Sequence, residues 1–113
     1  MSDKSLLMIQ EHLYKNYENK EFTLSTGQTN YDYLDNVTGA FATIPGYTTV
    51  NIRSDQAITV RINSTDNDYI TIEANKTFEL DNLLFITNIY ITNASGSTAN
   101  IKILGINKNN RDA

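Results

Sequence analysis

Between Tyr47 and Ile106, short apolar and β-branched runs alternate with polar turns. Within each run, apolar side chains recur at every second position, which predicts strands that have one buried face. The predicted inner rows are Val50/Ile52, Ile58/Val60/Ile62, Ile70/Ile72, Phe78/Leu80, Ile89/Ile91 and Ile101/Ile103. Because a strand cannot bury one face alone, these strands must pair and stack. The pattern therefore predicts an all-β protein with two packed layers.

The start of the chain follows a different period. A helix is predicted over about residues 2–19, because apolar residues recur there at helical spacing without an intervening Gly or Pro. Its apolar stripe consists of Leu6, Ile9, Leu13 and Tyr17. Two roles are open for this helix: it packs on its own sandwich, or it docks onto a neighbour. The predicted organisation is an N-terminal helical arm over 1–20, a β-sandwich domain over 21–107 and a polar tail over 108–113.

The predicted strand over about residues 84–92 has apolar residues on both faces. One face carries Phe85, Ile89 and Ile91, and the other carries Leu84, Ile86 and Tyr90. Two apolar faces indicate burial on both sides, and a small two-layer sandwich covers one of them. Either the N-terminal helix or another subunit must cover the second. The predicted interface residues are Leu6, Ile9, Leu13, Tyr17, Leu84, Ile86 and Tyr90.

Composition narrows the class of protein. The 113 residues suit one domain, and 40% hydrophobic with 19% charged residues is typical of a globular chain. A net charge of −4 without a basic stripe argues against nucleic acid as a partner. Without cysteine there is no disulfide framework or thiolate metal site. No apolar run is long enough to span a membrane, and the interrupted N-terminal run is not a secretory signal.

Few residues suggest chemistry. His12 is the only histidine, and no nucleophile motif lies near it, so a solvated imidazole is expected rather than a catalytic triad. Asp66 and Asp68 lack the spacing of a calcium-binding loop and are expected in a solvated turn, as are Asp32 and Asp35. We predict no enzyme, no cofactor and no metal site.

Several other polar and aromatic residues have more than one interpretation. An aromatic cluster consists of Tyr31, Tyr33, Tyr47 and Phe41. If exposed, it stacks on a sugar ring or anchors an interface; if buried, it closes one end of the core. Four Asn-x-Ser/Thr sequons are expected to arise by chance in an Asn- and Thr-rich chain; they start at Asn36, Asn63, Asn75 and Asn93. Two outward arginines, Arg53 and Arg61, are expected to pair across a sheet with Glu73 or Glu79.

The runs VRINS (60–64), ITIEANKTFELDNL (70–83) and YITNASGSTANIKIL (90–104) resemble small β-sandwich virion proteins of tailed bacteriophages, which decorate the head or attach to the neck. The resemblance covers about half of the chain and transfers no individual functional residue. It implies a non-enzymatic virion component that is assembled in the host cytoplasm. Its partners would be other virion proteins and further copies of itself, bound through repeated subunit contacts.

Together, pattern and resemblance predict a jelly-roll-like antiparallel β-sandwich of about eight strands with an N-terminal α-helix. The expected function is that of a structural virion protein of a tailed phage, a homo-oligomer that binds neither nucleic acid nor membrane. The alternative is a carbohydrate-binding β-sandwich module for host-surface glycans, because a sandwich also suits sugar binding.

Overall fold

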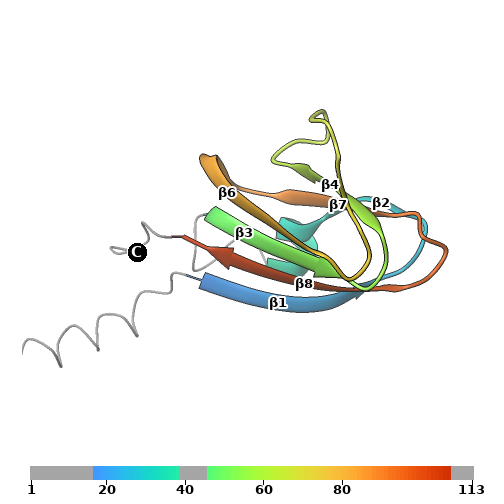
Figure 1. Ribbon diagram of the computed structural model, residues 1–113. Helices are drawn as coiled ribbons and strands as arrows, with labels where there is room; N and C mark the ends of the chain where they lie inside the picture. The colour runs from blue at the N-terminus through green and yellow to red at the C-terminus, as the bar shows by residue number, and fades with distance from the viewer. Residues whose placement is uncertain (1–16, 39–45, 108–113) are drawn as a thin grey trace, which may run out of the picture.

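The computed structural model describes residues 17–38 and 46–107, without the side chains of residues 82–84 (Figure 1). Within these residues, the chain forms eight strands and one π-helical turn, η1. In chain order they are β1 (Tyr17–Leu24), β2 (Gln28–Asp32), η1 (Leu34–Thr38), β3 (Tyr47–Ser54), β4 (Ile58–Ile62), β5 (Ile70–Ile72), β6 (Thr77–Ile86), β7 (Ile89–Asn93) and β8 (Ala99–Ile106).

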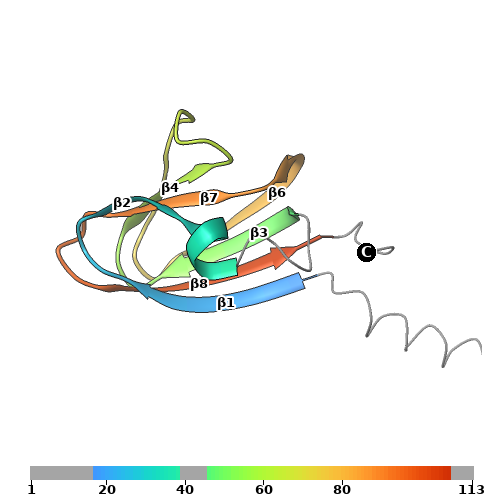
Figure 2. The same cartoon turned by 180° about the vertical axis from the view of Figure 1, so that it is seen from behind.

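The strands form two antiparallel sheets of four strands each. Sheet A has the order β1-β8-β3-β6, and sheet B has the order β2-β7-β4-β5. The sheets lie in two layers, with η1 following β2 on the side seen in Figure 2. Among consecutive strands, β4 and β5 pair within one sheet, and the other described connections cross between the sheets. The prediction of an all-β protein with two antiparallel layers is confirmed.

The core lies between the sheets and is built mainly of isoleucine and valine. Most of the predicted inner residues are buried there: Val50, Ile52, Ile58, Val60, Ile72, Ile89, Ile91, Ile101 and Ile103. Four others are half-buried and pack against this core: Ile62, Ile70, Phe78 and Leu80. Their partial exposure follows from position, because β5 and β6 are edge strands and Ile62 ends β4.

The single strand predicted over residues 84–92 is two strands in different sheets. β6 ends at Ile86 in sheet A, and β7 begins at Ile89 in sheet B. Ile86 is fully buried, whereas Phe85 is 43% exposed, so the predicted faces of these two residues were wrong. The alternation of inward and outward residues starts again when the chain crosses to the other sheet, so one continuous count through residues 84–92 assigns the wrong faces. The argument that one strand needs cover on both faces therefore fails.

Two asparagines stabilise the connection between β6 and β7, where the chain crosses from sheet A to sheet B. The side-chain oxygen of Asn63 accepts the backbone N–H groups of Thr87 at 2.7 Å and Asn88 at 3.3 Å. The Asn88 side chain accepts the backbone N–H of Leu34 at 2.9 Å and donates to Oδ1 of Asp32 at 2.7 Å. Asn88 thereby ties the crossing between the sheets to the start of η1.

The first strand begins at Tyr17, so the helix predicted through residue 19 is wrong over its last residues. β1 pairs along its whole length with β8, and this backbone pairing outweighs the helical spacing of the side chains. The inward positions of β1 start with Glu18 and Lys20, which hid the strand from a search for alternating apolar residues. The remainder of the predicted arm and the polar tail over 108–113 lie outside the described residues.

Candidate functional site

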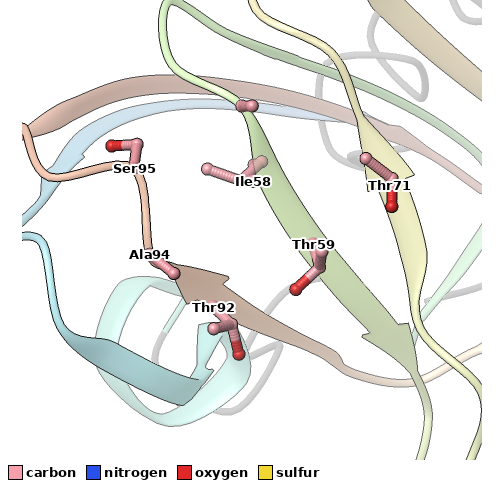
Figure 3. A pocket seen from close by; sticks show the side chains of 7 residues that line it. Ile58, Thr59, Thr71, Thr92, Ala94 and Ser95 are labelled. Atoms are coloured by element: carbon pink, nitrogen blue, oxygen red, sulfur yellow. The ribbon is translucent and has the colours of Figure 1, made fainter.

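The outer face of sheet B is hollowed by a shallow depression of about 180 Å³ (Figure 3). At its centre, Thr59 of β4 pairs with Thr92 of β7 on one side and with Thr71 of β5 on the other. This register places three threonine side chains in a row across neighbouring strands. The depression is lined by Ala57, Ile58, Thr59, Thr71, Thr92, Ala94 and Ser95.

The threonines give the depression both apolar and polar groups. The Thr92 hydroxyl accepts the backbone N–H of Asn30 at 3.0 Å. The hydroxyls of Thr59 and Thr71 form no hydrogen bond with any residue that the structure describes. A hydroxyl both donates and accepts, and each threonine adds a methyl group to the apolar surface of Ala57 and Ala94. The arrangement suits a ligand that has a carbon face and hydroxyl groups.

A second row of side chains lies beside the threonines on the same face. Tyr90 of β7 pairs with Arg61 of β4, and the Arg61 guanidinium lies 5.6 Å from the ring centroid of Tyr69. Nη1 of Arg61 also donates to the backbone oxygen of Asn67 at 2.6 Å. Tyr69 is 59% exposed. Two residues along a strand span about 7 Å, so this row borders the depression directly.

The outer face of sheet A carries an apolar patch, which consists of Tyr17, Leu104 and Ile106. Tyr17 of β1 pairs with Ile106 of β8 and is 57% exposed. Leu104 and Ile106 occupy successive outward positions of β8 and are half-buried. Single exposed apolar residues are ordinary on a protein surface, but these three are contiguous. The patch lies at the end of β1 to which residues 1–16 are joined.

A buried polar cluster joins sheet A to the segment before η1. Tyr47 donates to Oε1 of Glu18 at 2.8 Å, and the hydroxyls of Tyr33 and Tyr47 are 2.9 Å apart. Because Tyr47 uses its hydrogen on Glu18, Tyr33 is the donor in the second bond. Burial raises the pKa of Tyr33 to about 12 and raises that of Tyr47 still further, with the neighbouring Glu18 carboxylate adding to the effect on Tyr47. Both phenols stay protonated at neutral pH and hold the core together.

This cluster decides the role of the predicted aromatic residues. Tyr33 and Tyr47 are fully buried, and the half-buried Tyr31 stacks on Phe22 with 6.3 Å between ring centroids. These tyrosines therefore close one end of the core, and the alternative in which Tyr33 and Tyr47 stack on a sugar is wrong. Phe41 lies outside the described residues.

The predicted interface residues that the structure describes, Tyr17, Ile86 and Tyr90, do not lie together. Tyr17 belongs to the apolar patch on sheet A, Tyr90 lies on the outer face of sheet B, and Ile86 is in the core. The side chain of Leu84 lies outside what the structure describes, as do Leu6, Ile9 and Leu13. Leu104 and Ile106 were missed, although the run Ile103-Leu104 already places apolar residues on both faces of the last strand.

The predicted acidic positions do not form a metal centre. Among the described residues, no three His, Cys, Asp or Glu side chains are placed to hold a metal ion. Asp66 and Asp68 are exposed in the loop between β4 and β5, whereas Asp32 accepts hydrogen bonds from Asn88 and from the backbone N–H of Asp35. His12 lies outside the described residues.

The sequon asparagines and the arginines have local roles. Asn93 is fully buried and donates to the backbone oxygens of Leu24 and Ser97 at 2.8 and 2.9 Å, and Asn63 holds the crossing after β6. The Asn36 amide donates to the Asp32 backbone oxygen, and Asn75 is exposed with φ of 62°. Arg53 and Arg61 lie in different sheets, and among the described residues neither forms an ion pair with a glutamate, so the expected pairing is wrong. The register partners of Arg53 are Thr77 and Lys102, and that of Arg61 on β7 is Tyr90.

Comparison with known proteins finds a similar fold and no matching sequence. No family model and no curated protein sequence matches the chain. Among solved structures, the chain is similar to the solution NMR structure of a de novo designed double-stranded β-helix. The TM-score is 0.50 at 13% sequence identity, and the match covers 76% of this chain and 95% of that chain. Within the described residues, no helix has the length and apolar character needed to cross a membrane.

Proposed function

We propose that the chain is a non-enzymatic structural subunit that joins copies of itself within a larger particle. The observation that carries this proposal is the position of the apolar patch. Tyr17, Leu104 and Ile106 form a contiguous surface at the start of β1, and the preceding residues 1–16 include the apolar residues Leu6, Ile9 and Leu13. An apolar patch on the sheet is therefore adjacent in sequence to a segment that is itself rich in apolar residues.

The proposed cover of the patch is residues 1–16 of a second copy. The segment contains no Gly or Pro, which are the residues that most strongly favour a sharp reversal of the chain. Continuing past the end of β1, it would reach a neighbouring subunit. Full burial of one Leu or Ile side chain is worth about 1.5–3 kcal/mol, so several such residues offset the cost of association.

The strand order supports a finer description of the fold as a jelly roll. In the orders β1-β8-β3-β6 and β2-β7-β4-β5, the chain passes between the sheets at nearly every connection. A jelly roll is an eight-stranded double sheet of this kind, and it recurs in viral capsid and lectin domains. With the resemblance of residues 60–104 to small virion proteins of tailed bacteriophages, this supports the virion as the particle and its head or neck as the place of attachment.

Sedimentation velocity of the full chain tests the proposal. The wild-type chain is expected to form an oligomer, and Leu104→Glu is expected to sediment as a monomer with an unchanged circular dichroism spectrum. Thr23→Glu is the matched control, because Thr23 is an exposed outward residue at the other end of β1. A wild-type chain that stays monomeric at millimolar concentration would contradict the proposal, as would equal effects of the two variants.

A further inference from the structure

We propose that the depression on the outer face of sheet B binds neutral carbohydrate. This site is independent of the proposed assembly function, because the apolar patch belongs to the outer face of the other sheet. A subunit fixed through sheet A would present sheet B to its surroundings. The two activities would then operate on opposite faces of one sandwich.

The chemistry of the depression matches a sugar ring. A sugar has a face of carbon-bound hydrogens and an edge of hydroxyl groups. The depression provides methyl groups from Ala57, Ala94 and the threonines, with hydroxyl groups in the same row. Thr59 and Thr71 make no hydrogen bond to the described residues, and Thr92, which accepts from Asn30, keeps its hydrogen for a ligand.

Tyr69 supplies an aromatic wall that is already held in place. The Arg61 guanidinium packs over its ring, and Arg61 is itself fixed by its bond to the Asn67 backbone oxygen. A preorganised aromatic side chain loses little conformational entropy on binding. The exposed part of the Tyr69 ring and the row of threonines therefore form a rigid, amphipathic surface.

The charges near the depression favour a neutral sugar over an acidic one. Arg61 is the cation of the second row, and one of its donors is already used by Asn67. The loop that leads to Tyr69 carries Asp66 and Asp68, both exposed. A carboxylate on the ligand would meet these two negative charges beside a single positive one, so it would gain little. The volume of about 180 Å³ is small and open, so we expect Kd on the order of 1 mM.

Backbone amide NMR spectra of the ¹⁵N-labelled full chain, titrated with maltotetraose, mannotetraose and N-acetylchitotetraose, test the proposal. At least one of these neutral sugars is expected to shift the amides of Thr59, Thr71 and Thr92. Thr59→Val and Tyr69→Ala should each weaken binding about tenfold, since the first leaves a sugar hydroxyl without its partner. Thr23→Val is the control, because it removes a hydroxyl from the outer face of sheet A.

Several results of the titration would count against the site or its ligand class. Absence of shifts at tens of millimolar of every sugar overturns it, as does binding that Thr59→Val leaves unchanged. Stronger binding of sialyllactose than of the neutral sugars contradicts the ligand class. Shifts that depend on protein concentration, appear without sugar and vanish in Thr59→Val would show that a second copy occupies the face. Loss of assembly in Leu104→Glu with sugar binding retained would separate this site from the proposed function.

Discussion

The aromatic ring of Tyr47 lies directly over the backbone of Gly105. A Cβ atom at Gly105 would come within 2.3–2.4 Å of three ring carbons of Tyr47. Gly105 on β8 is also the register partner of Glu18 on β1. The tyrosine therefore passes over the central strand and places its hydroxyl 2.8 Å from the carboxylate two strands away. The missing side chain at Gly105 is what allows the buried cluster of Glu18, Tyr33 and Tyr47 to form.

Gly105→Ala is expected to destabilise the fold, because the added methyl group occupies the space of the Tyr47 ring. Overpacking of this kind costs about 1–3 kcal/mol of unfolding free energy, measured by urea denaturation. Lys102→Ala on the same strand is the control, since it removes an exposed ion pair with Glu21 at 3.6 Å that is worth about 0–1 kcal/mol. Equal losses in the two variants would show that Tyr47 does not lie over Gly105.

Tyr47→Phe is expected to cost about 1–3 kcal/mol of stability, because it leaves the buried Glu18 carboxylate without its donor. Glu18→Gln keeps an acceptor and removes the charge, so Tyr47→Phe should cost less in that background. A double-mutant cycle by urea denaturation measures this coupling. Additive losses would mean that the two side chains do not interact.

Alkaline titration should show that the two buried tyrosines, Tyr33 and Tyr47, ionise only with unfolding. The pKa of Tyr33 is raised to about 12 and that of Tyr47 is raised further, mainly by burial. The unfolded chain loses these protons near pH 10, so the stability that they contribute is complete below about pH 10 and falls as the pH rises toward 12. Absorbance at the tyrosinate band should show Tyr33 and Tyr47 ionising only when the chain unfolds. Full ionisation of all tyrosines in the folded chain would contradict the burial of the cluster.

Asp55 should make the loop between β3 and β4 sensitive to acid. Its carboxylate accepts the backbone N–H of Asn100 at 2.8 Å and the Asn100 side-chain amide at 2.6 Å, and these bonds lower the pKa of Asp55. A lowered pKa gives stability that is present above the unfolded value near 4 and is lost as the pH falls below it. The stability difference between wild type and Asp55→Asn should therefore shrink between pH 5 and pH 2, with Asn100→Ala showing part of the effect. A difference that is independent of pH would refute this assignment.

Much of the core could be predicted from the sequence because isoleucine and valine alternate with polar residues in β3, β4 and β8. The crossing after β6 could not, because Ile86 and Ile89 enter the core from different sheets and simple counting places them on opposite faces of one strand. The polar residue Asn88, which is buried between them, marks the place where the chain leaves sheet A for sheet B. β1 was hidden for another reason, since its first inward residues are Glu18 and Lys20.

The sites depend on register, which the sequence does not supply. Ile58-Thr59, Ile70-Thr71 and Ile91-Thr92 repeat one inward and one outward residue, so outward threonines were predictable on three strands. Their meeting in one row follows from the pairing of β4 with both β5 and β7. The apolar patch likewise requires β1 beside β8, which are the first and last strands of the described chain.

The most direct test of the proposed assembly is a disulfide between two copies. The chain contains no cysteine, so full-length Leu13→Cys and Leu104→Cys can be mixed and oxidised without competing thiols. The account predicts a disulfide-linked heterodimer of the two variants, and it predicts that replacing Leu104→Cys by Thr23→Cys abolishes the product. If no heterodimer forms, or if a chain carrying both cysteines closes an internal bond at every dilution, the N-terminal segment does not dock on the patch of a second copy and the central claim is wrong.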